Sequence, residues 1–162
     1  MIDLRSLFSV LKIEPEIKDK KNAIEMSFEK TDIEFKNVSF SYDNKRNVLN
    51  KINFKIPSGS SLAIVGPTGS GKSTISRLLF RFYDVSSGSI LVNGKDVRDI
   101  TQVSLRKNIG VVPQDTVLFN DTIYYNLSYG KINADEKEIW EVARRAKPVS
   151  YTHLRAHETM SN

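Results

Sequence analysis

The segment from Gly66 to Ser73 constrains this chain most. It reads Gly-Pro-Thr-Gly-Ser-Gly-Lys-Ser, so a lysine and a serine directly follow its last glycine. The pattern G-x-x-x-x-G-K-[ST] is typical of a loop that surrounds phosphate groups with its backbone N–H groups. An apolar run at 62–65 precedes the loop, and a helical pattern follows it. The segment therefore predicts a nucleotide-phosphate site between a strand and a helix.

Each residue type in this loop suits the chemistry of a bound triphosphate. Glycines let the backbone approach the phosphates and adopt positive φ. Lys72 is expected to contact the β- and γ-phosphates, a catalytic as well as a binding role, and the Ser73 hydroxyl to ligate Mg²⁺. The predicted contacts with ATP and Mg²⁺ extend over the whole loop: Gly66, Pro67, Thr68, Gly69, Ser70, Gly71, Lys72, Ser73 and, through its backbone N–H, Thr74.

The composition is that of an ordinary globular domain. The 162 residues are 40% hydrophobic and 27% charged, which suffices for one domain with its own core. The net charge is +5, but basic and acidic residues are mixed, which favours a solvated surface over a nucleic-acid interface. Without cysteine, disulfides and thiolate metal sites are excluded. No apolar run approaches the roughly 18 residues of a membrane span, so the chain as given is expected to be soluble, alone or as part of a membrane protein.

Hydrophobic periodicity divides the chain into predicted elements. A short amphipathic helix is expected over residues 1–14, followed by a polar linker that prolines interrupt. A period of two then predicts antiparallel strands over 33–42, with a bulge near Asn37, and over 52–56. The runs at 62–65 and 109–112 are apolar throughout, as in strands buried on both faces of a parallel sheet.

Helical patterns and turn signals fill the remainder. The helix after the loop is expected to pack through Ile75, Leu78, Leu79 and Phe82, with Arg77 and Arg81 on its outer side. Asn93-Gly94 predicts a hairpin turn. Further helices are expected at 101–107 with Thr101 as cap, at 122–127 with Asp121 as cap, and at 134–147.

The last segment, 148–162, has no regular period and holds both histidines of the chain. His153 and His157 are four residues apart, a spacing that suits a metal on one helix face, but two histidines without a nearby cysteine form an incomplete site. We therefore expect no metal there.

Several motifs together resemble an ATP-binding cassette (ABC) domain. Their order and rough spacing match that family: Val38-Ser-Phe-Ser-Tyr42, the phosphate loop, Leu105-Arg106 and Val111-Val-Pro-Gln-Asp-Thr-Val-Leu-Phe119. The chain is similar to the Atm-type, heavy-metal-tolerance half-transporters of bacteria and mitochondria, on the evidence of Leu78-Leu-Phe-Arg-Phe-Tyr83 and Asn120-Asp-Thr-Ile-Tyr-Tyr-Asn126. The resemblance covers residues 1 to about 147.

The resemblance implies a fold and two further site residues. The fold would be α/β, a P-loop NTPase with an incomplete RecA-like parallel core and an N-terminal antiparallel β-subdomain. Tyr42 would stack on adenine, although an outward-facing strand tyrosine is the alternative. Gln114 would reach Mg²⁺ and the attacking water, a catalytic role, and would join Ser73 as a metal ligand.

The resemblance also implies an organisation for the chain. Residues 1–31 would be a helix and linker from an absent membrane domain, and 32–147 the N-terminal part of the ATP-binding domain. Residues 148–162 resemble translated adapter sequence and would be a non-native tail. The intact protein would be an exporter that couples ATP binding and hydrolysis to transport. It would work as a homodimer with its own or a fused transmembrane domain, on the cytoplasmic or matrix face of a membrane, without nucleic acid.

The chain departs from the family pattern beyond Gln114. The signature motif, the acidic pair that binds metal and activates water, and the switch histidine are not found. Leu127-Ser-Tyr-Gly130 echoes the signature but follows Gln114 too soon, and Asp115 does not replace the acidic pair. We therefore expect ATP binding without hydrolysis by this chain. Two alternatives stay open: a nucleotide-binding module that never hydrolyses, and a DNA-linked P-loop ATPase.

Overall fold

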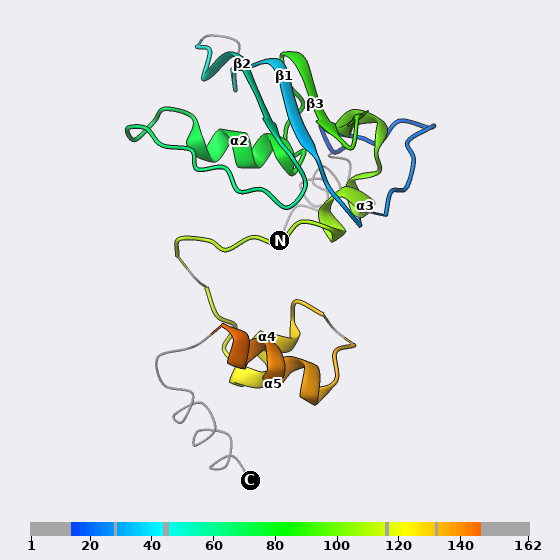
Figure 1. Ribbon diagram of the computed structural model, residues 1–162, viewed down its shortest axis with the longest axis vertical. Helices are drawn as coiled ribbons and strands as arrows, with labels where there is room; N and C mark the ends of the chain where they lie inside the picture. The colour runs from blue at the N-terminus through cyan, green and yellow to red at the C-terminus, as the bar shows by residue number, and fades with distance from the viewer. Residues whose placement is uncertain (1–13, 28, 44–45, 116, 132, 147–162) are drawn as a thin grey trace, which may run out of the picture. The chain divides into compact units, whose positions relative to one another are not determined.

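A computed structural model describes residues 14–27, 29–43, 46–115, 117–131 and 133–146 (Figure 1). The chain forms two compact units, Met1–Val111 and Val112–Asn162. The helix predicted over 1–14 lies, apart from its last residue, outside the described residues, and the tail predicted over 148–162 lies wholly outside them. Among the described helices, none combines the length and the apolar character that a bilayer span requires.

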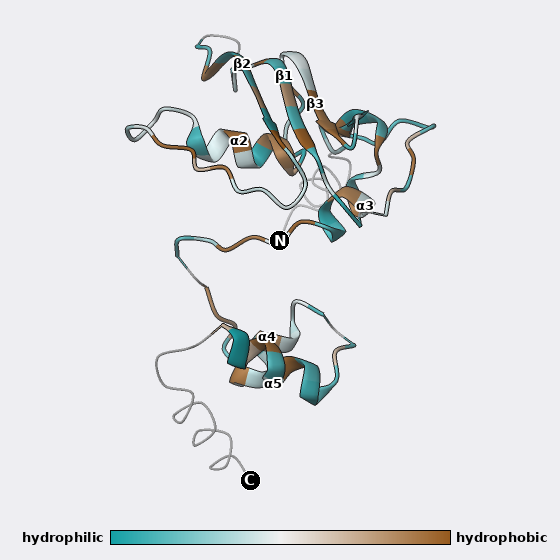
Figure 2. Ribbon diagram, viewed as in Figure 1, coloured by the Kyte–Doolittle hydropathy of each residue, from teal (hydrophilic) through white to brown (hydrophobic). Residues whose placement is uncertain are grey.

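The first unit contains a four-stranded antiparallel sheet in the order β2-β1-β3-β4 (Figure 1). Its strands are β1 (Ile33–Phe40), β2 (Leu49–Ile56), β3 (Ser87–Val92) and β4 (Lys95–Asp96). The period of two arises because alternate side chains of β1 face the core, and Figure 2 shows both hydrophobic and hydrophilic residues along this strand. The predicted antiparallel subdomain is confirmed.

The predicted irregularity in β1 is also confirmed. The pairing register shifts between Phe35 and Val38, and Asn37 adopts a left-handed conformation with φ 48°. Its backbone N–H donates to Asn53 Oδ1 at 2.8 Å, so a neighbouring side chain satisfies the group that the bulge withdraws from the ladder.

One face of the sheet packs against the helix that follows the phosphate loop and against the segment after β4. The loop helix is α2 (Lys72–Leu79), and the later segment forms the 3₁₀-helix η1 (Val97–Asp99) and α3 (Gln102–Lys107). Thr101 caps α3 as predicted, its side chain accepting from the Ser104 N–H. The buried core consists of Phe35, Val38, Phe40, Leu49, Leu78, Ile90, Val92, Val97, Ile100 and Leu105.

The two strands predicted as buried in a parallel sheet are not formed. The residues at 62–65 and 109–112 have no strand assignment, and Val65 and Val112 are 88% and 96% exposed. A strand requires a neighbour to accept its backbone hydrogen bonds, and no strand of the described sheet pairs with either segment. An apolar run alone does not supply that neighbour, and this prediction is wrong for the structure.

The second unit contains two helices, α4 (Ile123–Ser128) and α5 (Glu136–Arg145). The side chain of Thr122 caps α4 by accepting from the Tyr125 N–H, so the cap predicted at Asp121 is wrong by one residue. Asp121 instead accepts from the Thr122 N–H at 2.7 Å. Asp135 caps α5 through the Glu138 N–H, and Ile139 is buried on its inner face.

Candidate functional site

The phosphate loop leads directly into α2, which begins at Lys72. Gly71 stands at the N-cap with φ 91°, and a Cβ there would meet Leu49 Cδ2 at 2.8 Å. The left-handed backbone favours glycine here, and any Cβ would also crowd the Val48 carbonyl oxygen at 3.2 Å. Gly69 also has positive φ, 82°, with open space around it, so its requirement is conformational alone.

The beginning of α2 is suited to an anion. Gly71 provides no side-chain cap, and the first turn contains no acidic residue. The N–H groups of a first helical turn have no partner within the helix, and the positive end of the helix dipole lies beside them. This end of α2 therefore leaves donors and a favourable field for phosphate, without a carboxylate that competes for either.

Lys72 bends back over the loop that precedes it. Its Nζ donates to the carbonyl oxygens of Gly66 at 2.8 Å and Pro67 at 2.7 Å. An ammonium group has three N–H donors, so one of the three is left for a phosphate oxygen. The positive charge is thereby held at the phosphate loop.

Ser73 and Thr74 follow in the first turn of α2. Ser73 is exposed, and Thr74 is buried at 5% exposure. The Thr74 N–H, expected to bind phosphate, here donates to the Gly71 carbonyl at 3.0 Å. The Thr74 hydroxyl lies 3.2 Å from the hydroxyl of Tyr42.

Tyr42 lies beside α2 just beyond the end of β1. Its ring packs edge-on against Phe40 and Tyr83, with centroid distances of 4.8 and 5.1 Å, and it remains 45% exposed. Besides Thr74, the hydroxyl has a second partner, Arg77 Nη1, which donates at 3.1 Å. Burial raises the pKa of this hydroxyl, but the hydrogen bonds to Thr74 and Arg77 and the charge of Arg77 together bring it below its usual value. The structure thus brings Tyr42 together with the phosphate-loop helix.

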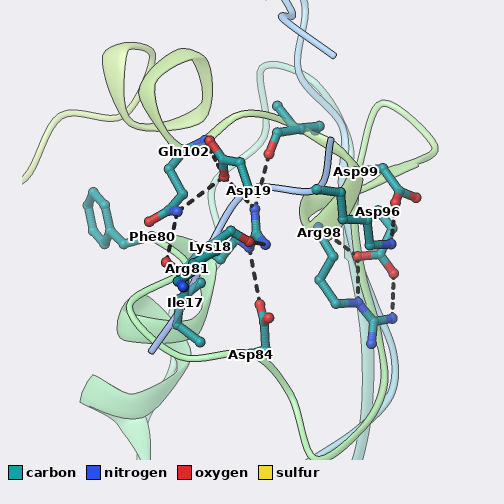
Figure 3. Close-up of polar contacts among 12 residues, drawn as sticks. Ile17, Lys18, Asp19, Phe80, Arg81, Asp84, Asp96, Arg98, Asp99 and Gln102 are labelled. Carbon is teal, nitrogen blue, oxygen red and sulfur yellow. Dashed lines mark hydrogen bonds and ion pairs between the residues drawn. The ribbon is translucent and has the colours of Figure 1, made fainter. Parts of the chain in front are cut away.

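Sequence analysis did not predict the hydrogen bond from Arg77 to Tyr42, and it expected Arg81 to be exposed although Arg81 is buried. Arg77 was expected only on the outer side of α2, but Thr74 and Arg77 are three residues apart and so share a helix face. That spacing is a signal that the sequence contained. Arg81 was also expected outside, yet its side chain is only 2% exposed, and Figure 3 shows it surrounded by polar partners.

Gln114 belongs to the other unit, so the structure does not place it in one unit with the phosphate loop. It follows Pro113 in an irregular segment and is exposed.

Farther along this unit, Asn126 Oδ1 accepts from the Phe119 N–H at 2.7 Å, and the Phe119 ring packs on Tyr129 at 4.6 Å. The described residues contain no group of three or more acidic, histidine or cysteine side chains arranged to hold a metal.

Comparison with known proteins identifies relatives of this chain. A profile described as "ABC transporter" matches residues 49–162. The chain is 46% identical to ABC transporter B family member 6 of Dictyostelium discoideum over 92% of its own length and 24% of that protein. It is 52% identical to human ATP-binding cassette sub-family B member 6 over 90% of its length and 17% of that protein. It is 51% identical to the mitochondrial iron-sulfur clusters transporter atm1 of Aspergillus fumigatus over 91% of its length and 20% of that protein.

A solved structure is similar throughout most of the chain. It is entitled "Structure of a bacterial Atm1-family ABC exporter with ATP bound", and it aligns with a TM-score of 0.78 and 47% sequence identity. The alignment covers 84% of this chain and 24% of that one. This chain therefore spans about a quarter or less of the length of the relatives it matches.

Proposed function

Because the chain belongs to the ABC transporter family, with the P-loop NTPase fold and antiparallel N-terminal sheet of its nucleotide-binding domains, we propose that it binds ATP for an exporter. ATP binding and hydrolysis in the full-length protein would drive transport across a membrane. The similarity to Atm1-type exporters supports this class, and a solved relative of that family has ATP bound.

The observation that carries the proposal is the arrangement around the start of α2. A lysine held over the loop by two carbonyl groups, an uncapped helix start and a glycine packed against β2 together fit a polyphosphate. We propose that residues Gly66 to Thr74 bind the phosphates of ATP and that the Tyr42 ring stacks on its adenine. Thr74 contributes its backbone N–H once its bond to the Gly71 carbonyl gives way.

We further propose the sites of Mg²⁺ and of the attacking water. The Ser73 hydroxyl is exposed in the first turn of α2, one residue from the Lys72 ammonium, and oxygen is the ligand that Mg²⁺ prefers. Gln114 supplies a second oxygen to the metal and orients water. When bound, the metal neutralises charge that develops on the phosphate oxygens. Lys72 contributes to the same neutralisation, which is its catalytic role.

The organisation of the intact protein is likewise a proposal. Residues 1–31 connect to a membrane domain, 32–147 belong to the ATP-binding domain, and 148–162 are a non-native tail. The protein assembles as a homodimer with a fused or separate transmembrane domain, and its ATP-binding parts lie on the cytoplasmic or matrix face. It binds no nucleic acid, and the absence of salt-sensitive binding to duplex DNA would be the test.

A titration of the chain with Mg-ATP tests the nucleotide site. We expect Lys72→Ala to weaken binding by at least tenfold, because a charge-assisted contact of about 1.5 to 3 kcal/mol is lost. Lys107→Ala, which removes an exposed lysine at the end of α3, is the matched control and should leave the affinity unchanged. Equal affinity of the unaltered chain and the Lys72→Ala variant would reject the proposed site.

A further inference from the structure

Arg81 carries a buried positive charge and is not among the residues of the proposed nucleotide site. It follows the end of α2 by two residues, has a left-handed backbone conformation with φ 53°, and is 2% exposed. Burial of a guanidinium is costly unless its donors and its charge are both satisfied. The partners of Arg81 therefore indicate which segments of the chain it holds together.

Those partners come from three separate parts of the chain (Figure 3). Nη1 donates to Asp19 Oδ1 at 3.0 Å and to the Ile100 carbonyl at 3.2 Å, and Nη2 donates to the Lys18 carbonyl at 3.1 Å. Nε donates to Asp84 Oδ1 at 3.1 Å. Asp19 and Asp84 provide the negative charge, whereas the two carbonyl groups complete the hydrogen bonding.

Asp19 belongs to a segment, residues 17–24, that we call the strap. Its carboxylate also accepts from the Gln102 backbone N–H, at 3.1 and 3.2 Å, and from Gln102 Nε2 at 3.1 Å. At the other end of the strap, Ile24 forms a parallel bridge with Ile100: its N–H donates to the Asp99 carbonyl, and its carbonyl accepts from the Thr101 N–H. The strap, predicted as a linker, is thus held through Asp19 and Ile24 to α3, η1 and the segment between them.

Helix α3, which binds Asp19 of the strap through Gln102, also binds the backbone at the end of α2. Arg106, from α3, donates through Nε to the Phe80 carbonyl at 3.0 Å and through Nη2 to the Arg81 carbonyl at 2.9 Å. Carbonyl groups at the end of a helix have no partner within it, so Arg106 satisfies groups that α2 leaves open. The strap, α3 and the end of α2 consequently form one polar cluster.

The phosphate loop and this cluster lie at opposite ends of one short helix. α2 has eight residues, which corresponds to about 12 Å along its axis. If this short helix moves as a rigid body, a change in position at Lys72 is transmitted to Arg81, two residues beyond its end. On the basis of the proposed nucleotide site, we infer that Arg81 is a positioning residue for the phosphate loop and that the strap is energetically coupled to nucleotide binding.

Coupling of this kind has a thermodynamic consequence. If the docked strap stabilises the position of α2 that binds ATP, then bound ATP stabilises the docked strap by the same factor. A purely structural Arg81 would stabilise the fold without linking the two events. The two roles differ in a measurement made on the folded chain with and without ligand.

The test is a pair of measurements on the full 162-residue chain. Mg-ATP affinity is measured by titration, and amide hydrogen exchange of Ile24 and Gln102 is followed with and without Mg-ATP. Asp19→Ala removes the carboxylate that joins the strap to Arg81. Lys20→Ala is the matched control, because it removes another charge from the strap, whose ion pair with Asp99 has partners that are 51% and 50% exposed and so contributes little. Arg81 itself is not changed first, because loss of a buried cation invites misfolding.

We expect Mg-ATP to slow exchange at both amides in the unaltered chain. Asp19→Ala should lower the affinity by about twofold to thirtyfold, the range that coupling mutations produce, and should abolish this protection. Lys20→Ala should change the affinity by less than about twofold, and Asp19→Glu should recover most of the loss. If Asp19→Ala does not fold, Asp19→Asn, which keeps an acceptor but loses the charge, provides the same comparison.

Two results would overturn the inference and leave the proposed function intact. One is faster exchange of the strap in Asp19→Ala with unchanged Mg-ATP affinity. The other is binding of Mg-ATP to the unaltered chain, sensitive to Lys72→Ala, with no change in exchange at Ile24 or Gln102. Failure of the unaltered chain to bind Mg-ATP would instead overturn the proposed function and this inference with it.

Discussion

At the residue scale, Tyr42 combines two properties that a nucleotide site needs. Its ring is 45% exposed, which leaves surface for a flat base, while contacts with Phe40 and Tyr83 fix its plane. Its hydroxyl is held by Thr74 and Arg77, both on the helix that begins at the phosphate loop. The distance between the proposed adenine and phosphate sites is thus set by short side-chain contacts.

We expect Tyr42→Ala to weaken adenine nucleotides while inorganic triphosphate binds nearly as before. Stacking of a base on an aromatic ring contributes about 1 to 3 kcal/mol, and triphosphate has no base. Competitive titration with the two ligands measures the difference. Tyr42→Phe, which keeps the ring and removes the hydroxyl, is the matched control and should preserve most of the adenine preference. An equal loss for both ligands in Tyr42→Ala would mean that Tyr42 supports the fold rather than the base.

At the element scale, the antiparallel sheet depends on a close approach of β3 to the bulge in β1. Gly88, the second residue of β3, has φ 83°. A Cβ at this position would lie 2.3 Å from the Asn37 carbonyl oxygen and 2.4 Å from that of Lys36. Both contacts are with backbone atoms of β1, which cannot move without disturbing the ladder.

Gly88→Ala should therefore destabilise the chain far more than Gly94→Ala. Gly94 lies in the hairpin turn with φ 74° and open space around it, so alanine there carries only the left-handed conformational cost of about 1 to 2 kcal/mol. Gly88→Ala adds the clash and should cost above about 3 kcal/mol, enough to unfold a marginal domain. Urea denaturation followed by circular dichroism compares the two variants, and similar midpoints would contradict the assigned packing of β3 on β1.

At the scale of the whole molecule, binding ATP and cleaving it make different demands on the chain. In the proposed site, Lys72 supplies positive charge, and Ser73 and Gln114 supply oxygen ligands. In-line attack on the γ-phosphate also requires a residue that orients or deprotonates water. Sequence analysis found no such acidic pair and no signature motif after Gln114.

We predict that the chain releases no phosphate from ATP above background, even under conditions where it binds the nucleotide. A phosphate-release assay on purified protein measures this, with Lys72→Ala as the control for contaminating ATPases. Sustained turnover that disappears in Lys72→Ala would reveal a catalytic carboxylate that the sequence patterns do not identify.

The sequence by itself determined the features whose signals are local. The helix that follows the phosphate loop, the alternation of β1, the bulge at Asn37 and the Thr101 cap were all predicted, because each depends on residues within a few positions of one another. The hairpin at Asn93-Gly94 belongs to the same group, since both residues adopt positive φ, 49° and 74°. For these elements, backbone conformational preference and hydrophobic period suffice.

Only the tertiary structure decided which side chains and segments find partners. Arg81 has the spacing of an outer helix residue, but it is buried because Asp19, 62 positions earlier, supplies its counter-charge. The apolar runs at 62–65 and 109–112 have the composition of buried strands, yet Val65 and Val112 are exposed because no strand of the described sheet pairs with them. Burial of a charge or of a strand depends on a partner distant in sequence, and a local pattern does not specify that partner.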